Sequence, residues 1–203
     1  MNTNRRNLIT GTALAPLALL PAGLAARPAT SSGRTALPNV MLTTHQNRRV
    51  RFYDDLVGGN RIVVINFMYA QCDDICPGAT ANLALVQQAL GARVGREVFM
   101  YSITLEPQKD TPAVLAHYAK GFDIKPGWSF LTGAPADVER LRRALRFVDR
   151  NRALDRDRRQ HTGMVRIGND ALDRWTACPA LLKPAQLARE IMWVGLRAAS
   201  EAG

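Results

Sequence analysis

The sequence predicts an α/β domain in which helices cover a mixed β-sheet. Three observations support this prediction. The run Ile62–Tyr69 is β-branched and almost continuously apolar, which is typical of a central parallel strand buried on both faces. Strand patterns alternate with helical patterns through the middle of the 203-residue chain, and prolines stand where the helical patterns begin. Hairpin patterns flank this middle part, so we expect a sheet with both parallel and antiparallel pairs.

The other strands follow from short β-branched and aromatic runs that lie between turn signals. Val40–Thr44 and Val50–Tyr53 flank a polar turn and predict an N-terminal hairpin. Glu97–Thr104 and Trp128–Leu131 predict two strands beside the central one. A second hairpin is expected near the C-terminus, over Met164–Ile167 and Leu172–Thr176.

Four helices are expected, each opened by a proline in or near its first turn. The first runs from Pro77 to about Leu90, and the last runs from Pro184 to about Leu196. The two between them begin at Pro112 and Pro135 and continue with apolar residues at helical spacing. We interpret Asp110 as an N-cap ahead of the second of these four helices.

The N-terminal segment, residues 1–25, resembles an export signal. Paired arginines, Arg5 and Arg6, precede a run rich in Ala and Leu, as in twin-arginine signals, and small residues follow the run. A Sec-type signal or a membrane anchor is the alternative interpretation. Residues 26–37 have the composition of a flexible tether, and residues 38–203 form the expected folded domain. We therefore expect a periplasmic protein, or one anchored in the membrane and facing the periplasm.

The composition is that of a globular, basic protein. Hydrophobic residues make up 47% and charged residues 22%, and the formal net charge is +10. Nine arginines lie between Arg140 and Arg159. They form either a solvated surface or a docking surface for an acidic protein or an anionic membrane. Nucleic acid is not an expected partner, because no nucleic-acid-binding motif accompanies these arginines.

Cys72 and Cys76 carry the sharpest chemical signal. They lie where the predicted central strand gives way to a helix, and open α/β sheets place active groups at this end of their strands. Pro77 disfavours a helical conformation for Cys76, so we expect Cys76 at or just before the helix start. Helix N–H groups and the positive end of the helix dipole favour the thiolate there. Two thiolates make a soft site suited to cuprous copper.

The same pair of thiols supports other interpretations. They can act catalytically in thiol–disulfide exchange, with one thiol attacking and the other resolving. They can also form a static disulfide or stay buried. The third cysteine of the chain, Cys178, leaves an odd thiol and is simplest to explain as a buried structural residue.

Three segments resemble the Sco/SenC family of thioredoxin-fold copper proteins that take part in cytochrome c oxidase assembly. Phe67–Pro77 contains the Cys-x-x-x-Cys-Pro signature, and Ile103–Pro112 and Gly127–Gly133 are similar to two further blocks. The resemblance implies a thioredoxin-like mixed sheet flanked by helices. It also implies copper, as Cu(I) or Cu(II), bound by Cys72, Cys76 and a late histidine.

The histidine that matches this late position is His161. An arginine-rich stretch precedes it instead of the usual family residues, and the alternative interpretation is a surface loop histidine. Glu106 stands where relatives commonly have Asp. His45 and His117 are expected to be ordinary surface residues.

The resemblance implies a metallochaperone that passes copper to the copper-centre subunit of a terminal respiratory oxidase. A thiol–disulfide oxidoreductase acting on partner cysteines is the second hypothesis, and the two activities can be stages of one task. A redox-sensing docking module, which needs no histidine, is the third. Turnover as an enzyme is not expected from the first hypothesis.

Overall fold

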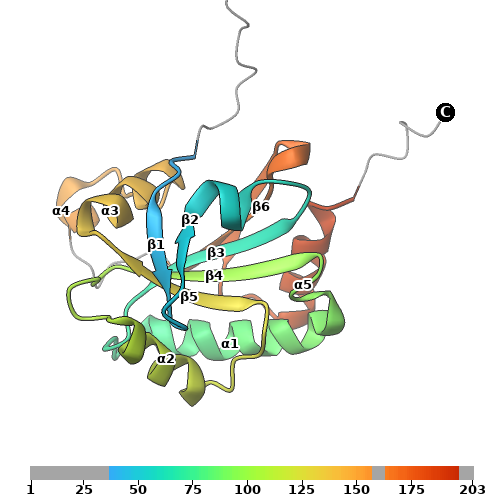
Figure 1. The fold of residues 1–203 in the computed structure, drawn as a ribbon. Helices are drawn as coiled ribbons and strands as arrows, with labels where there is room; N and C mark the ends of the chain where they lie inside the picture. The colour runs from blue at the N-terminus through green and yellow to red at the C-terminus, as the bar shows by residue number, and fades with distance from the viewer. Residues whose placement is uncertain (1–36, 157–162, 197–203) are drawn as a thin grey trace, which may run out of the picture. The chain divides into compact units, whose positions relative to one another are not determined.

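The computed structural model describes residues 37–156 and 163–196. The predicted export signal and nearly all of the predicted tether lie outside these residues. The described part forms a seven-stranded sheet in the order β2-β1-β5-β4-β3-β6-β7, drawn in Figure 1. Within the described ranges, no helix is long and apolar enough to cross a membrane.

The central strands are parallel, as the sequence predicts. β3 (Ile62–Met68) pairs in parallel with β4 (Val98–Thr104), which pairs in parallel with β5 (Trp128–Gly133). Every residue of β3 is buried. Its side chains alternate between two apolar clusters, so that Val64 and Met68 face one cluster and their neighbours face the other. β3 therefore has a hydrophobic layer on each face.

Both predicted hairpins are present at the edges of the sheet, which makes the sheet mixed. β1 (Met41–Thr44) pairs antiparallel with β2 (Arg49–Arg51) and with β5. β6 (Met164–Asn169) pairs antiparallel with β3 and with β7 (Arg174–Pro179). β2 ends earlier than predicted, because the chain turns at Phe52 into a short helical segment that contributes buried residues to the core.

Helices cover both faces of the sheet (Figure 1). The apolar cluster that Val64 and Met68 face, here called the first cluster, contains residues of α1, α2 and α5. The second cluster, on the other face of the sheet, contains residues of α3 and of the helical segment Phe52–Val57. The five α-helices of the described residues are α1 (Ile75–Leu90), α2 (Pro112–Gly121), α3 (Pro135–Ala144), α4 (Arg152–Arg156) and α5 (Pro184–Trp193). The short α4 is an addition to the four expected helices.

The arginine-rich stretch folds partly onto itself. Arg142 makes a bidentate pair with Asp155, at 2.6 and 3.0 Å, and also binds Glu139 at 2.8 Å. Arg143 also pairs with Glu139, at 2.6 Å. These acids hold α4 against the C-terminal part of α3. Arg146, Arg150 and Arg152 are exposed and have no ion pair within the described residues, so the predicted docking surface is reduced to a few arginines there.

His45 is half-buried rather than an ordinary surface residue. Its ring Nδ1 accepts a hydrogen bond of 3.1 Å from the backbone N–H of Phe130. Burial lowers the pKa of His45 below its ordinary value of 6.5. The unfolded chain therefore binds a proton more readily, and the stability that neutral His45 contributes is complete above pH 6.5 and is lost as the pH falls.

We expect the free energy of unfolding to fall between pH 7.5 and pH 5.5, and to fall less in His45→Asn. Urea denaturation at the two pH values measures this difference. His117→Asn is the matched control, since His117 is exposed on α2. An equal pH dependence in His45→Asn and the wild type would contradict the assignment.

Candidate metal centre

Cys72 and Cys76 are brought together by the loop that joins β3 to α1. β4 holds the start of this loop, because Leu105 N–H donates to the carbonyl of Met68 at 2.8 Å. Cys72 closes a turn, donating its N–H to the carbonyl of Tyr69 at 3.3 Å. Cys76 lies one residue after the start of α1. The loop therefore brings Cys72 back to the N-terminus of α1, the helix that carries Cys76.

The helix begins two residues before Pro77, so Cys76 is inside the first turn and not at or before the helix start. A proline is tolerated in the first turn, because its missing N–H would have no partner within the helix. Asp74 at the N-cap position makes no side-chain capping bond. The Cys72 sulfur instead accepts hydrogen bonds from the backbone of Asp74 and Cys76.

The two thiols ionise at different pH values. Burial opposes ionisation of Cys72, but hydrogen bonds from the Cys76 side chain, the Asp74 and Cys76 backbone and the Tyr69 side chain outweigh it, so the pKa of Cys72 lies below its ordinary value. Burial raises the pKa of Cys76, and its hydrogen bond to Cys72 raises it further. Cys72 is therefore the first thiol to become a thiolate, with Cys76 as its hydrogen-bond donor.

Both cysteines carry reduced thiols that lie just beneath the surface. Cys72 is 6% exposed and Cys76 is 2% exposed. The pair can undergo either of two reactions: oxidation to a disulfide, or loss of both protons to bind a soft metal ion. Among the described residues, no third Cys, His, Asp or Glu completes a three-ligand cluster with them.

His161, the expected third ligand, lies outside the described residues. Two residues further along the sequence, Gly163 lines a small cavity of about 10 Å³ together with Met164, Ile75 and Cys76. The carbonyl of Gly163 also accepts a hydrogen bond of 2.8 Å from Ala180 N–H. Gly163 is thus fixed beside Cys76, the second cysteine.

Gly163 occupies a position that disfavours a side chain. Its φ of +55° lies in the left-handed region, and an added Cβ would lie 2.4 Å from Cδ1 of Ile75. We expect Gly163→Ala to lower the free energy of unfolding by about 1–2 kcal/mol through backbone strain. Chemical denaturation measures this loss. Ile75→Val in the same background relieves only the side-chain contact, so a full rescue by the double variant would contradict backbone strain as the cause.

Asp110 is not the N-cap of α2. Since Pro112 is the first helical residue, the capping position belongs to Thr111, whose side chain accepts from Val114 N–H at 3.3 Å. The carboxylate of Asp110 is buried and instead accepts a hydrogen bond of 3.0 Å from the backbone N–H of Ala70. Ala70 belongs to the loop that joins β3 to α1, which we call the cysteine loop. Sequence analysis missed this contact, although the proline at the first helical position already pointed to Thr111 as the cap.

Three further residues were considered in the sequence: Glu106, His117 and Cys178. Glu106 forms an ion pair with Lys109 at 3.2 Å. His117 is exposed on α2, as expected. Cys178 lies half-buried on β7 and packs against the first apolar cluster, and burial raises its pKa to about 11. Its thiol is therefore protonated at neutral pH, which fits a structural role.

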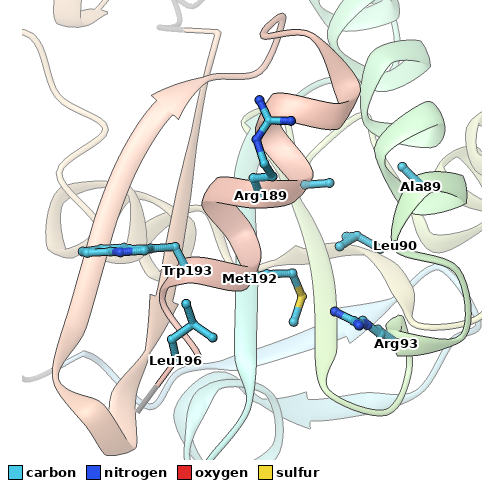
Figure 2. Close-up of a pocket in the computed structure, with 8 residues that line it drawn as sticks. Ala89, Leu90, Arg93, Arg189, Met192, Trp193 and Leu196 are labelled. Carbon is cyan, nitrogen blue, oxygen red and sulfur yellow. The ribbon is translucent and has the colours of Figure 1, made fainter. Parts of the chain in front are cut away.

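A larger groove of about 480 Å³ lies between the C-terminal part of α1 and α5, and Figure 2 shows its lining. Trp193 and Leu196 are exposed at its rim, and Arg93 and Arg189 flank it. Ala89, in its wall, is 13 residues after Cys76 on the same helix. At 1.5 Å per residue this places the groove about 20 Å from the thiols, so it is no part of the thiol site.

Comparison with known proteins identifies the family. The family model described as SCO1/SenC matches residues 38–194, which is most of the chain. The chain belongs to the SCO1/SenC family. The match spans Cys72, Cys76, Asp110 and the position of His161. The three segments that resemble the family in the sequence therefore all lie within this one match.

Individual SCO1/SenC relatives match over shorter stretches. The mitochondrial SCO2 homologue of Bos taurus is 33% identical over 99 residues, covering 48% of this chain and 36% of the relative. The SCO1 homologue of Bacillus subtilis is 32% identical over 69 residues, covering 34% of this chain and 35% of the relative. The alignments thus span about a third of the length of these curated relatives.

Solved Sco structures share the fold over nearly their whole length. Copper-bound ScoI of Bradyrhizobium japonicum matches with a TM-score of 0.61 and 24% identity, covering 76% of this chain and 96% of that structure. Yeast Sco1 matches with a TM-score of 0.60 and 21% identity, covering 75% and 93%. These matches confirm the thioredoxin-like mixed sheet flanked by helices.

Proposed function

We propose that this SCO1/SenC protein binds copper through Cys72, Cys76 and His161 and delivers it to a respiratory oxidase during cytochrome c oxidase assembly. The observation that carries the proposal is the thiol pair at the start of α1, where one thiol has a lowered pKa and its partner donates a hydrogen bond to it. This pair can present two sulfur ligands to one ion once both thiols have lost their protons.

Chain connectivity supports His161 as the third ligand. Gly163 shares a cavity with Cys76. His161 precedes Gly163 by two residues in the sequence, and two residues span at most about 7 Å. An imidazole is a ligand for copper in both oxidation states, whereas two thiolates alone favour Cu(I). Three such ligands would let the protein carry either Cu(I) or Cu(II).

Relatives support copper as the cargo and an oxidase as the destination. ScoI of Bradyrhizobium japonicum has been solved with copper bound. A further solved structure, BsSco, is described as a member of the Sco family of cytochrome c oxidase assembly proteins. We infer that the acceptor is the copper-centre subunit of a terminal oxidase. The predicted export signal and a Bacillus anthracis relative described as a lipoprotein support an exported form that is anchored in the membrane.

Copper binding by the reduced protein tests the proposal. We expect one copper per chain and a cupric absorption band in the visible range, and we expect His161→Ala to lose that band and to bind Cu(II) far more weakly. His117→Ala is the matched control, because His117 is exposed on α2. Unchanged copper content and spectrum in His161→Ala would contradict the assignment of the third ligand.

Thiol–disulfide exchange is the second candidate, and the split in pKa between the two thiols favours it. The Cys72 thiolate would attack a partner disulfide, forming a mixed disulfide and releasing one partner thiolate. Cys76, after losing its proton, would then attack the Cys72 sulfur, closing the Cys72–Cys76 disulfide and releasing the second partner thiolate. His161→Ala should retain this activity toward a model disulfide, which separates exchange from copper binding.

A further inference from the structure

Asp110 links the two sequence segments that meet at the thiol site. Its Oδ2 accepts from Ala70 N–H at 3.0 Å and from the Thr104 hydroxyl at 2.5 Å. Ala70 belongs to the loop that leads to Cys72, and Thr104 is the last residue of β4. One carboxylate oxygen therefore ties the cysteine loop to the carboxyl end of the neighbouring strand.

The carboxylate is itself held rigidly. Asp110 N–H donates to the carbonyl of Glu106 at 2.9 Å, which closes the turn between β4 and α2. The Thr104 hydroxyl oxygen accepts from Glu106 N–H at 2.9 Å, so its own hydrogen is free to point to Asp110. Asp110 thus transmits the position of β4 to the cysteine loop.

Two features distinguish Asp110 from a carboxylate that only stabilises the fold. It is 1% exposed, and its Oδ1 has no hydrogen-bond partner among the described residues. Buried polar atoms are usually paired, so the unpaired Oδ1 calls for an explanation. Burial raises the pKa of Tyr118 to about 12, and the charges of Cys76, Cys72 and Asp110 add to this shift. Tyr118 also packs against the apolar cluster that contains Cys72 and Cys76.

We propose that Asp110 is a positioning residue of the thiol site, which holds the Ala70 amide and thereby fixes Cys72 at the distance from Cys76 that one copper ion requires. This inference rests on the proposed copper-binding function. The contact is made through a hydrogen-bond acceptor, so an amide oxygen at the same place can serve as well. Loss of the acceptor frees the loop and lets the two sulfurs drift apart.

Three variants of the full chain separate positioning from stability. Asp110→Ala removes the acceptor, and Asp110→Asn keeps an oxygen that the Ala70 N–H can reach. Thr111→Ala is the matched control, because it removes the neighbouring N-cap and destabilises α2 without touching the cysteine loop. The measurements are Cu(I) affinity by competition with a chromophoric chelator, the Cys72–Cys76 dithiol–disulfide equilibrium against dithiothreitol, and thermal unfolding.

We expect Asp110→Ala to weaken Cu(I) binding by at least about 10-fold, as loss of a supporting hydrogen bond does at metal sites, and to shift the dithiol–disulfide equilibrium. Asp110→Asn should keep most of the wild-type Cu(I) affinity and most of the wild-type dithiol–disulfide equilibrium. Thr111→Ala should lower the unfolding temperature and leave both site measurements unchanged. If Asp110→Ala and Thr111→Ala behave alike in copper affinity and in the disulfide equilibrium, the proposal is wrong.

A second variant and a metal-free measurement cover the cases in which Asp110→Ala does not fold or the wild type binds no copper. If Asp110→Ala does not fold, Asp110→Ser takes its place, since its polar side chain is one bond shorter and withdraws the acceptor from the Ala70 amide. The same losses are expected, and wild-type values in Asp110→Ser would overturn the proposal. If the wild-type chain binds no copper, the proposed function fails, while the disulfide equilibrium still tests Asp110 because it needs no metal.

Discussion

Replacing either Cys72 or Cys76 by serine is expected to abolish stoichiometric binding of Cu(I). Each change removes one of only two soft ligands, and a hydroxyl is a poor substitute for a thiolate toward this ion. The loss should exceed the roughly 100-fold that removal of an outer-shell partner costs. Copper retained after gel filtration in the presence of a competing chelator measures it. Copper retention by Cys72→Ser equal to that of the wild type would contradict the site.

The two thiols should also differ in their reactivity toward an alkylating reagent. In the wild type, Cys72 should be alkylated first by iodoacetamide near neutral pH, because its pKa is lowered while that of Cys76 is raised. Cys178→Ser is the matched control, since its thiol is protonated at neutral pH and lies on β7. We expect Cys178→Ser to bind copper as the wild type does.

The second large effect is expected at Asp155. Its side chain is 10% exposed and that of Arg142 is 13% exposed, so their bidentate pair is shielded from water. Asp155→Asn leaves Arg142 with Glu139 and with the carbonyl of Phe147. We expect a loss of about 3 kcal/mol in the free energy of unfolding, the lower end of the range for breaking a buried pair, because these contacts remain. Urea denaturation measures this loss.

The pH dependence of this loss follows from the pKa of Asp155. The hydrogen bond from Arg142 is the main cause that lowers it from 3.8 to about 2. A depressed pKa in the folded state gives stability that is present above pH 3.8 and disappears as the pH falls through about 2. The wild type and Asp155→Asn should therefore converge in stability at low pH. Arg152→Ala, at an exposed site on α4, should change little, and a loss there as large as in Asp155→Asn would contradict this account.

The sequence was sufficient for the sheet and for most helices, because local patterns and tertiary burial agree there. β3 is buried at every position, and its composition shows this directly. The hairpin turns and the prolines at helix starts also act locally. The short helical segment after β2 was not predicted, because burial of Phe52 and Leu56 in the core, and not local propensity, decides its course.

The candidate site was only partly predictable for a related reason. The cysteine spacing and its place at a strand-to-helix turn are local features, and the structure keeps them together. Asp110 reaches Ala70 across 40 positions of sequence, and His45 meets Phe130 across 85. Local propensity assigns such residues to caps and surfaces, since it contains no information about pairing between distant segments. Asp155 likewise finds Arg142 only after α4 has folded against α3.

X-ray absorption at the copper edge of the Cu(I)-loaded chain tests the central claim most directly, because it counts the atoms bound to the ion. Two sulfur neighbours and one nitrogen neighbour are predicted for the wild type, with the nitrogen lost in His161→Ala. A spectrum with one sulfur neighbour or none would contradict the account, since the ion would then lie elsewhere than between Cys72 and Cys76.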